Sequence, residues 1–157
     1  MKSNHANTPT PDTHNEAPRL AIVVGAHPAA EISDRPIAAA LASALASEWL
    51  KAAGASPAPG QILTVSDLWY VNDGMLRALP TIAVGPPEHN AFTAYLADKI
   101  PSVHVVDGVL IVQAELSFAS PLAACWGVDP ASTRRAAEVF ITKLVEMFVA
   151  HAAGIPA

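Results

Sequence analysis

Histidines and carboxylates stand where three apolar segments of the sequence end. His27 follows the first segment, Asp67 lies in the second, and Glu88 and His89 follow the third. Imidazole titrates near neutral pH and a carboxylate can orient it, so these residue types suit general acid–base catalysis. If the three segments end side by side, the sequence predicts a His/carboxylate site there.

The candidate site residues are chosen from where ligands bind in known α/β proteins. In open α/β sheets, ligands bind beyond the carboxyl ends of the strands. The side chains that this rule selects for catalysis are His27, His89, Asp67 and Glu115, and those selected for ligand binding are Glu88, Asn90, Gln113 and Trp69. A hydrolase or lyase that uses histidine as acid and base is the reaction class that this set suggests.

The same nitrogen and oxygen atoms would also suit a divalent metal. The patterns HEXXH, HXH and CXXC are absent, so we assign no metal ligand, and no cofactor can be named. The corner at Gly85 precedes a predicted helix, but Pro86 and Pro87 lack the N–H groups that a nucleotide phosphate would need. In a purely structural interpretation, His27 and His89 are turn residues that bond only local backbone.

Cys125 is the only cysteine, which excludes an intramolecular disulfide and favours a reducing compartment. It can be read as a nucleophile close to a helix start, or as a buried packing residue between alanines and Trp126. Trp126, like Trp69, stands next to a turn and can either line a pocket or pack in the core. No GXSXG motif marks a serine nucleophile.

The elements that must position these residues follow from apolar periodicity and turn residues. The predicted strands are 19–28, 61–71, 81–85 and the two arms of a hairpin over 103–113. The predicted helices are 33–54, the segment from the 86–90 corner to about 98–100, and 129–154. Residues 115–127 fit neither pattern clearly.

Several residues suggest how these elements begin and end. Ser33 or Asp34 is the expected cap of the first helix, with Pro36 in its first turn and Gly54 at its end. Asp107-Gly108 suits the two positive-φ positions of a type I′ hairpin turn.

Strands that alternate with helices predict an α/β fold. We expect a three-layer sandwich with a mixed, mostly parallel sheet of about five strands and three main helices, because the hairpin adds an antiparallel pair. Residues 1–18 are polar and rich in Pro, Asn and Thr, which predicts a disordered tail before a single domain over 19–157.

The charge and apolar content of the sequence argue against two classes of partner, nucleic acid and membranes. The formal charge is −5 and the nine Lys and Arg residues are scattered, which argues against nucleic acid. The N-terminus has no apolar signal region and no apolar run approaches the ~20 residues that span a bilayer, so we expect a soluble cytoplasmic protein without a membrane partner.

The last predicted helix carries an apolar arc wider than one sheet contact needs. Either it is wedged deeply in the domain or it also packs against a second subunit, and we expect a homo-oligomer through the 130–152 helix. This gives an alternative to the small-molecule site: a non-catalytic module that self-assembles or binds a partner through that helix.

Overall fold

The computed structural model describes residues 17–156, so the predicted tail lies almost wholly outside the described residues. In chain order the elements are β1 (Leu20–Val24), α1 (Pro28–Ala53), β2 (Ile62–Ser66), α2 (Asp67–Asn72), the 3-10 helix η1 (Leu76–Ala78), β3 (Thr81–Val84), α3 (Ala91–Leu96), β4 (Ser102–Val106), β5 (Leu110–Glu115), β6 (Leu122–Gly127), α4 (Pro130–Lys143) and α5 (Val145–Ala152).

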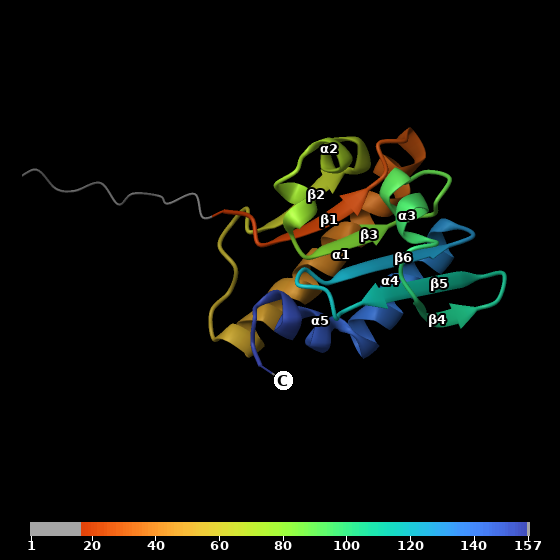
Figure 1. Ribbon diagram of the computed structural model, residues 1–157. Helices are drawn as coiled ribbons and strands as arrows, with labels where there is room; N and C mark the ends of the chain where they lie inside the picture. Colours follow the sequence, from red (N-terminus) through yellow and green to blue (C-terminus); the bar gives the residue numbers. More distant parts are fainter. Residues whose placement is uncertain (1–16, 157) are drawn as a thin grey trace, which may run out of the picture.

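The six strands form one mixed sheet in the order β2-β1-β3-β6-β5-β4 (Figure 1). β2, β1, β3 and β6 are parallel neighbours, whereas β5 is antiparallel to both β6 and β4. The predicted α/β class and mixed sheet are confirmed, with one strand more than expected. The additional strand is β6, which comes from the segment that sequence patterns left unassigned.

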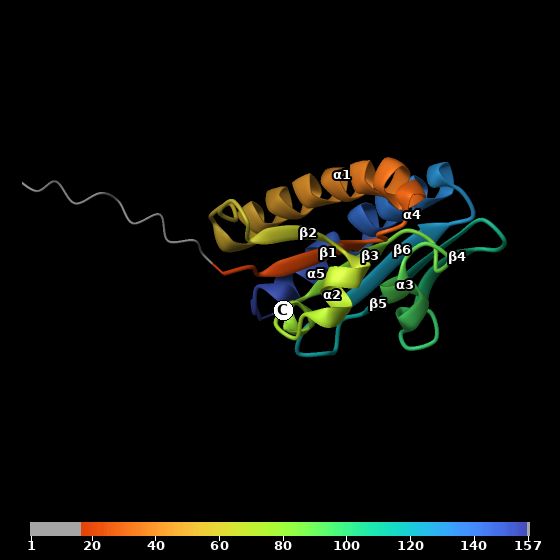
Figure 2. The ribbon, with the colours of Figure 1, turned by 90° about the horizontal axis from the view of Figure 1, so that it is seen from above.

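Helices cover both faces of this sheet, which gives the three layers seen from above in Figure 2. α1, α4 and α5 pack on one face, against Leu20, Ile22 and Val24 of β1. α2, η1 and α3 pack on the other face, against Ala21 and Val23. β1 is therefore buried on both sides, as its continuous apolar run predicts.

α1 begins five residues earlier than the sequence suggests. His27 is its N-cap, Pro28 stands at its first position, and Gly54 ends it with a φ of 73°. Asp34 is therefore an interior residue of the helix rather than its cap. Pro36 also lies inside the helix, where its ring removes one backbone N–H donor.

One predicted strand and one predicted turn differ from the structure. The strand expected over 61–71 stops at Ser66, because the Ser66 hydroxyl accepts a hydrogen bond from Trp69 N (3.3 Å) and starts α2. The hairpin is confirmed, but its turn is not type I′, since Gly108 has a φ of 66° and no residue other than glycine has positive φ in the described chain.

The long helix predicted over 129–154 is broken at Leu144, whose φ and ψ are −127° and −21°. The break directs α5 against α1, and the Phe140 and Phe148 rings meet edge to face at 5.5 Å. Most of the wide apolar arc is thus buried within the chain, as expected for a helix wedged deeply in the domain. Self-association through residues 130–152 stays a prediction.

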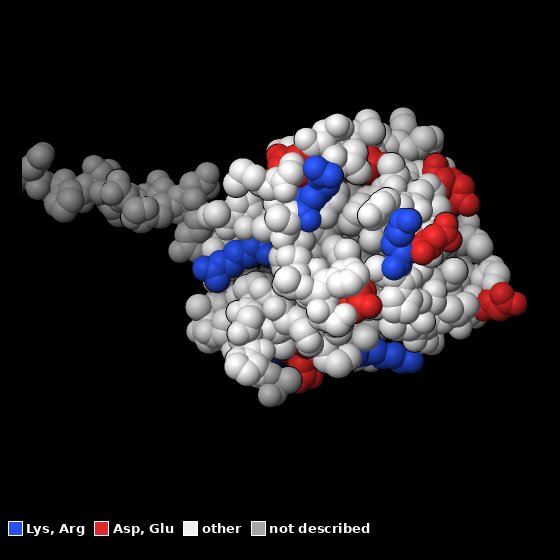
Figure 3. Space-filling view, in the orientation of Figure 1, with Lys and Arg blue, Asp and Glu red and all other residues white. Residues whose placement is uncertain are grey.

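Acidic and basic side chains are spread thinly over the surface shown in Figure 3, where Lys and Arg groups lie apart from one another. Within the described residues, none of the helices is both long and apolar enough to cross a membrane.

Phe148→Ala should lower the free energy of unfolding by about 3–5 kcal/mol, because Phe148 is fully buried in the α1/α4/α5 core. The neighbouring Met147, which is 47% exposed, gives the matched control: Met147→Ala should cost less than about 1 kcal/mol. Urea denaturation of both variants checks this. Equal losses would mean that α5 does not pack on the core in this way.

Candidate functional site

His27 and His89 meet at the carboxyl edge of the sheet. Their rings stack with centroids 4.4 Å apart and an interplanar angle of 10°. His27 follows β1 and His89 follows β3, and these strands are parallel neighbours. After β1 the chain goes to β2 on one side and then returns to β3 on the other, so the two rings stand at the point where the strand order reverses.

The backbone fixes which nitrogen of His27 is available. Nδ1 of His27 accepts a hydrogen bond from Ala29 N (3.1 Å) as the cap of α1. In the neutral ring the proton therefore resides on Nε2, which can donate to another molecule. The His27 side chain is exposed and His89 is half-buried, so water can reach this pair.

Two glycines allow this close approach. A Cβ at Gly25 would lie 1.8 Å from the backbone oxygen of His89, so any other residue there would displace the β3–α3 corner. A Cβ at Gly85 would lie 2.3 Å from Oδ2 of Asp34, and Gly85 also has a φ of 108°. Both residues are glycine because backbone and carboxylate occupy the space of a side chain.

Asp34 is a residue of this region that sequence reasoning missed. Its side chain is only 2% exposed; Oδ1 accepts a hydrogen bond from the Ser33 hydroxyl (3.2 Å), while Oδ2 is buried without a hydrogen-bond partner. Burial raises the pKa of Asp34, and the bond from Ser33 and the charge of nearby His89 offset part of that effect. The sequence held a signal for this position. Asp34 lies three residues before Ile37 and seven before Leu41, a spacing that places all three on the same buried face of the helix.

Asp67 occupies the predicted edge, but both oxygens of its carboxylate already accept hydrogen bonds from backbone N–H groups. Oδ1 accepts hydrogen bonds from Ala26 N and Leu68 N, both at 2.8 Å, and Oδ2 accepts one from Ala91 N at 2.7 Å. The side chain is 5% exposed. Asp67 thus joins the loop after β1 to the starts of α2 and α3, which is a structural role.

Asn90 is also saturated. Its Oδ1 accepts from Phe92 N and Thr93 N, and its Nδ2 donates to the carbonyl oxygens of Val23 and Val84. These four bonds are the full capacity of an amide side chain, so Asn90 has none left for a ligand. It caps α3 and ties the end of β1 to the end of β3.

The expectation that Gln113 and Glu115 share this edge is wrong. β5 runs antiparallel to β6, and Glu115 pairs with Leu122 at the start of β6, on the opposite edge of the sheet. Gln113 is buried, and its Nε2 donates to the carbonyl oxygens of Ala97 and Ile100 beyond α3. Glu115 is engaged locally by Ser117, which lowers its pKa.

Two further candidates lie outside the stacked pair. Trp69 is 56% exposed on α2 and does not line the pocket described next. Cys125 is fully buried in β6, and this burial raises the pKa of its thiol. A buried thiol with a raised pKa is a poor nucleophile, so the packing interpretation of Cys125 fits the structure.

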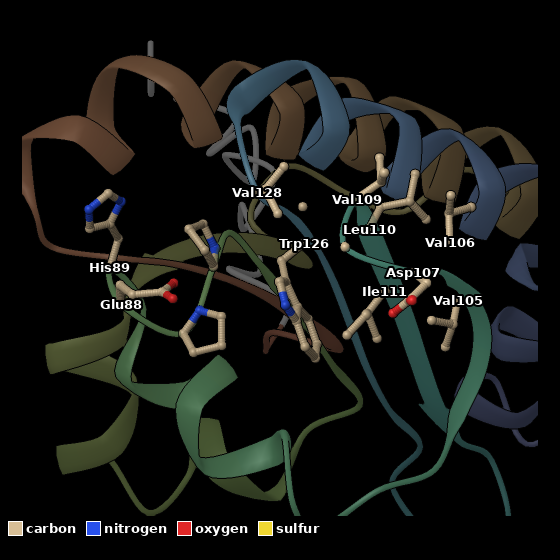
Figure 4. Close-up of a pocket in the computed structure, with 14 residues that line it drawn as sticks. Glu88, His89, Val105, Val106, Asp107, Val109, Leu110, Ile111, Trp126 and Val128 are labelled. Carbon is tan, nitrogen blue, oxygen red and sulfur yellow. The ribbon is translucent and has the colours of Figure 1, made fainter.

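A pocket of about 440 Å³ opens beside His89. Figure 4 shows Glu88 and His89 at one end and the β4–β5 turn at the other, with Trp126 between them. Its volume falls in the range of small-molecule sites. Of the predicted site residues it contains Glu88 and His89. Within residues 17–156, no group of three or more His, Cys, Asp or Glu side chains is arranged to hold a metal ion.

Comparisons with known proteins add no assignment: no protein-family model matches the chain, and no curated protein matches it.

Asp67→Ala should lower the free energy of unfolding by about 3 kcal/mol, because three backbone N–H groups in partly buried hydrogen bonds would lose their acceptor. Asp67→Asn, which keeps one oxygen, should cost less. Chemical denaturation measures both, with the exposed Asp98→Ala as the control. A loss for Asp67→Ala no larger than for Asp98→Ala would refute the bracing role.

Asp34→Asn should stabilise the protein at neutral pH. Because the pKa of Asp34 is raised, folding favours the protonated acid; the folded state carries no cost below about pH 3.8, and a cost develops as pH rises through the folded pKa. Asparagine removes the charge, so we expect a gain of about 1 kcal/mol at pH 7.5 that nearly vanishes at pH 3.5.

Urea denaturation at the two pH values tests this, with Asp98→Asn as the exposed control. A gain of the same size at both pH values, or a loss at pH 7.5, would contradict an ionised Asp34 in the folded protein.

Proposed function

We propose that this edge of the sheet is an acid–base site for a small molecule, and that hydrolysis is its reaction. The observation that carries the proposal is the stacked His27–His89 pair beside a buried, unpaired carboxylate oxygen of Asp34. Polar groups buried without a partner are costly. In the described residues Thr93 Oγ1 and Gln113 Oε1 also lack a partner, and Asp34 differs from them because its free oxygen faces Gly85, at the corner that carries His89.

The two rings suit different roles. His89 lines the pocket and is the candidate general base, which would take a proton from water as the water attacks the substrate. His27, whose Nε2 can donate, is the candidate acid for the leaving group or the donor that stabilises developing negative charge. Water reaches both rings, so the nucleophile that hydrolysis needs is available at the site.

Asp34 would act through His89 rather than on the substrate. When His89 takes a proton it becomes a cation, and a carboxylate in a poorly solvated position stabilises that cation more strongly than one in water. The free oxygen of Asp34 faces Gly85, at the corner that carries His89, which is the proximity that this role requires. Asp34 is thus a positioning residue.

The alternative, a non-catalytic assembly module, draws less support. Its main argument was the wide apolar face of the last helix, and Phe140, Val145 and Phe148 of that face are buried inside the chain. An assembly module also gives no reason for the unpaired oxygen of Asp34 near the corner that carries His89.

His89→Gln should lower the rate of hydrolysis of p-nitrophenyl acetate by ~10-fold or more, since a positioned general base contributes about 10²–10⁴-fold. The release of p-nitrophenolate measures the rate, with protein at micromolar concentration. His27→Gln should give a smaller loss, because His27 does not line the pocket.

His104→Gln is the matched control. His104 is a half-buried histidine of β4 that does not line the pocket beside His89. If His89→Gln and His104→Gln reduce the rate equally, the ester reacts with imidazoles in general, and the proposed site is rejected for this reaction.

A further inference from the structure

The pocket beside His89 has one flat aromatic wall. The Trp126 side chain stands in the middle of the lining, with Ile111 on the side of the hairpin (Figure 4). Pro86 and Pro87 add rigid apolar rings from the β3–α3 corner. A wall of indole and proline rings contacts a planar ring over a large area with little loss of side-chain freedom.

The charges at this pocket have one sign. Glu88 and Asp107 line it, both are exposed, and they come from opposite ends of it, the corner before α3 and the hairpin turn. No Lys or Arg is among its lining residues, which all lie in the described part of the chain. Two carboxylates without a Lys or Arg beside them repel an anionic ligand and attract a cation while His89 is neutral.

From these two features we infer that the pocket takes a small ligand with a planar apolar ring and a neutral or cationic substituent, and that it binds carboxylates and phosphate esters more weakly. The inference rests on the proposed small-molecule role of this edge and adds the substrate class. The ring lies against Trp126, and the polar substituent is directed toward Glu88 and His89, where the acid–base groups stand.

Three indoles that differ in charge test this: tryptophol is neutral, tryptamine is a cation and indole-3-acetate is an anion. Saturation-transfer NMR and shifts of the Trp126 indole N–H would measure their binding at low salt. We expect tryptamine and tryptophol to bind and indole-3-acetate to bind about 3- to 10-fold more weakly than tryptophol. Salt at 0.5 M should reduce the difference, since it screens exposed charges.

Substitutions can test the contact with the Trp126 ring separately from the effect of the Glu88 and Asp107 charges. Trp126→Ala should abolish binding of all three indoles, whereas Trp69→Ala, an exposed tryptophan on α2, should leave it unchanged. The double variant Glu88→Gln/Asp107→Asn changes only exposed side chains, so it tests the charge argument even if Trp126→Ala fails to fold. In it, the three dissociation constants should agree within about 2-fold.

The inference is overturned if no indole binds at millimolar concentration, or if indole-3-acetate binds as tightly as tryptamine. These outcomes differ from failure of the proposed function. Indole binding that depends on Trp126, with no effect of His89→Gln on ester hydrolysis, would uphold the ligand class and reject the chemistry. Hydrolysis that depends on His89, without indole binding, would uphold the chemistry and reject the ligand class.

Discussion

The carboxylate of Asp67 is the interaction on which the arrangement of this edge depends. It accepts hydrogen bonds from the backbone of three separate segments: the loop after β1, the start of α2 and the start of α3. Asn90 adds a bond from its amide to each of β1 and β3. A helix start leaves several N–H groups unpaired, so a buried carboxylate can hold short helices that have little packing of their own.

This rigid frame explains how a second carboxylate can be left unpaired nearby. Asp34 is held on α1, a long helix packed on the sheet, and faces Gly85 and the corner that carries His89. The helix cannot turn away without exposing Ile37 and Leu41, which are buried on the same stripe. Packing therefore maintains a polar group that would otherwise move to water, as is common where stability is given up for function.

The sequence was sufficient for the α/β class and for the two-sided burial of β1, because these depend on local pattern. It predicted the meeting of His27 with His89 only if their strands are neighbours, and the structure supplies that strand order. It was not sufficient for the direction of β5, which decides that Gln113 and Glu115 lie at the other edge. Strand direction is set by tertiary pairing with β6, a strand whose small residues gave no clear pattern of their own. The start of α1 was missed for a local reason: Pro36 resembles a first-turn proline although it lies inside the helix.

Hydrogen-bond capacity separates structural from functional polar groups at this edge better than residue type does. Asp67 and Asn90 looked as suitable for chemistry as His89, yet every acceptor and donor of Asn90 is engaged, and both oxygens of Asp67 are engaged. Asp34 would have been set aside as a cap, yet it keeps a buried oxygen without a partner. A saturated group braces the fold and has nothing left to offer a substrate, whereas an unsaturated group beside an accessible imidazole can respond when that imidazole gains a proton. Thr93 Oγ1 and Gln113 Oε1 also lack a partner, so the assignment to His89 and Asp34 depends on position as well: the free oxygen of Asp34 faces the corner that carries His89.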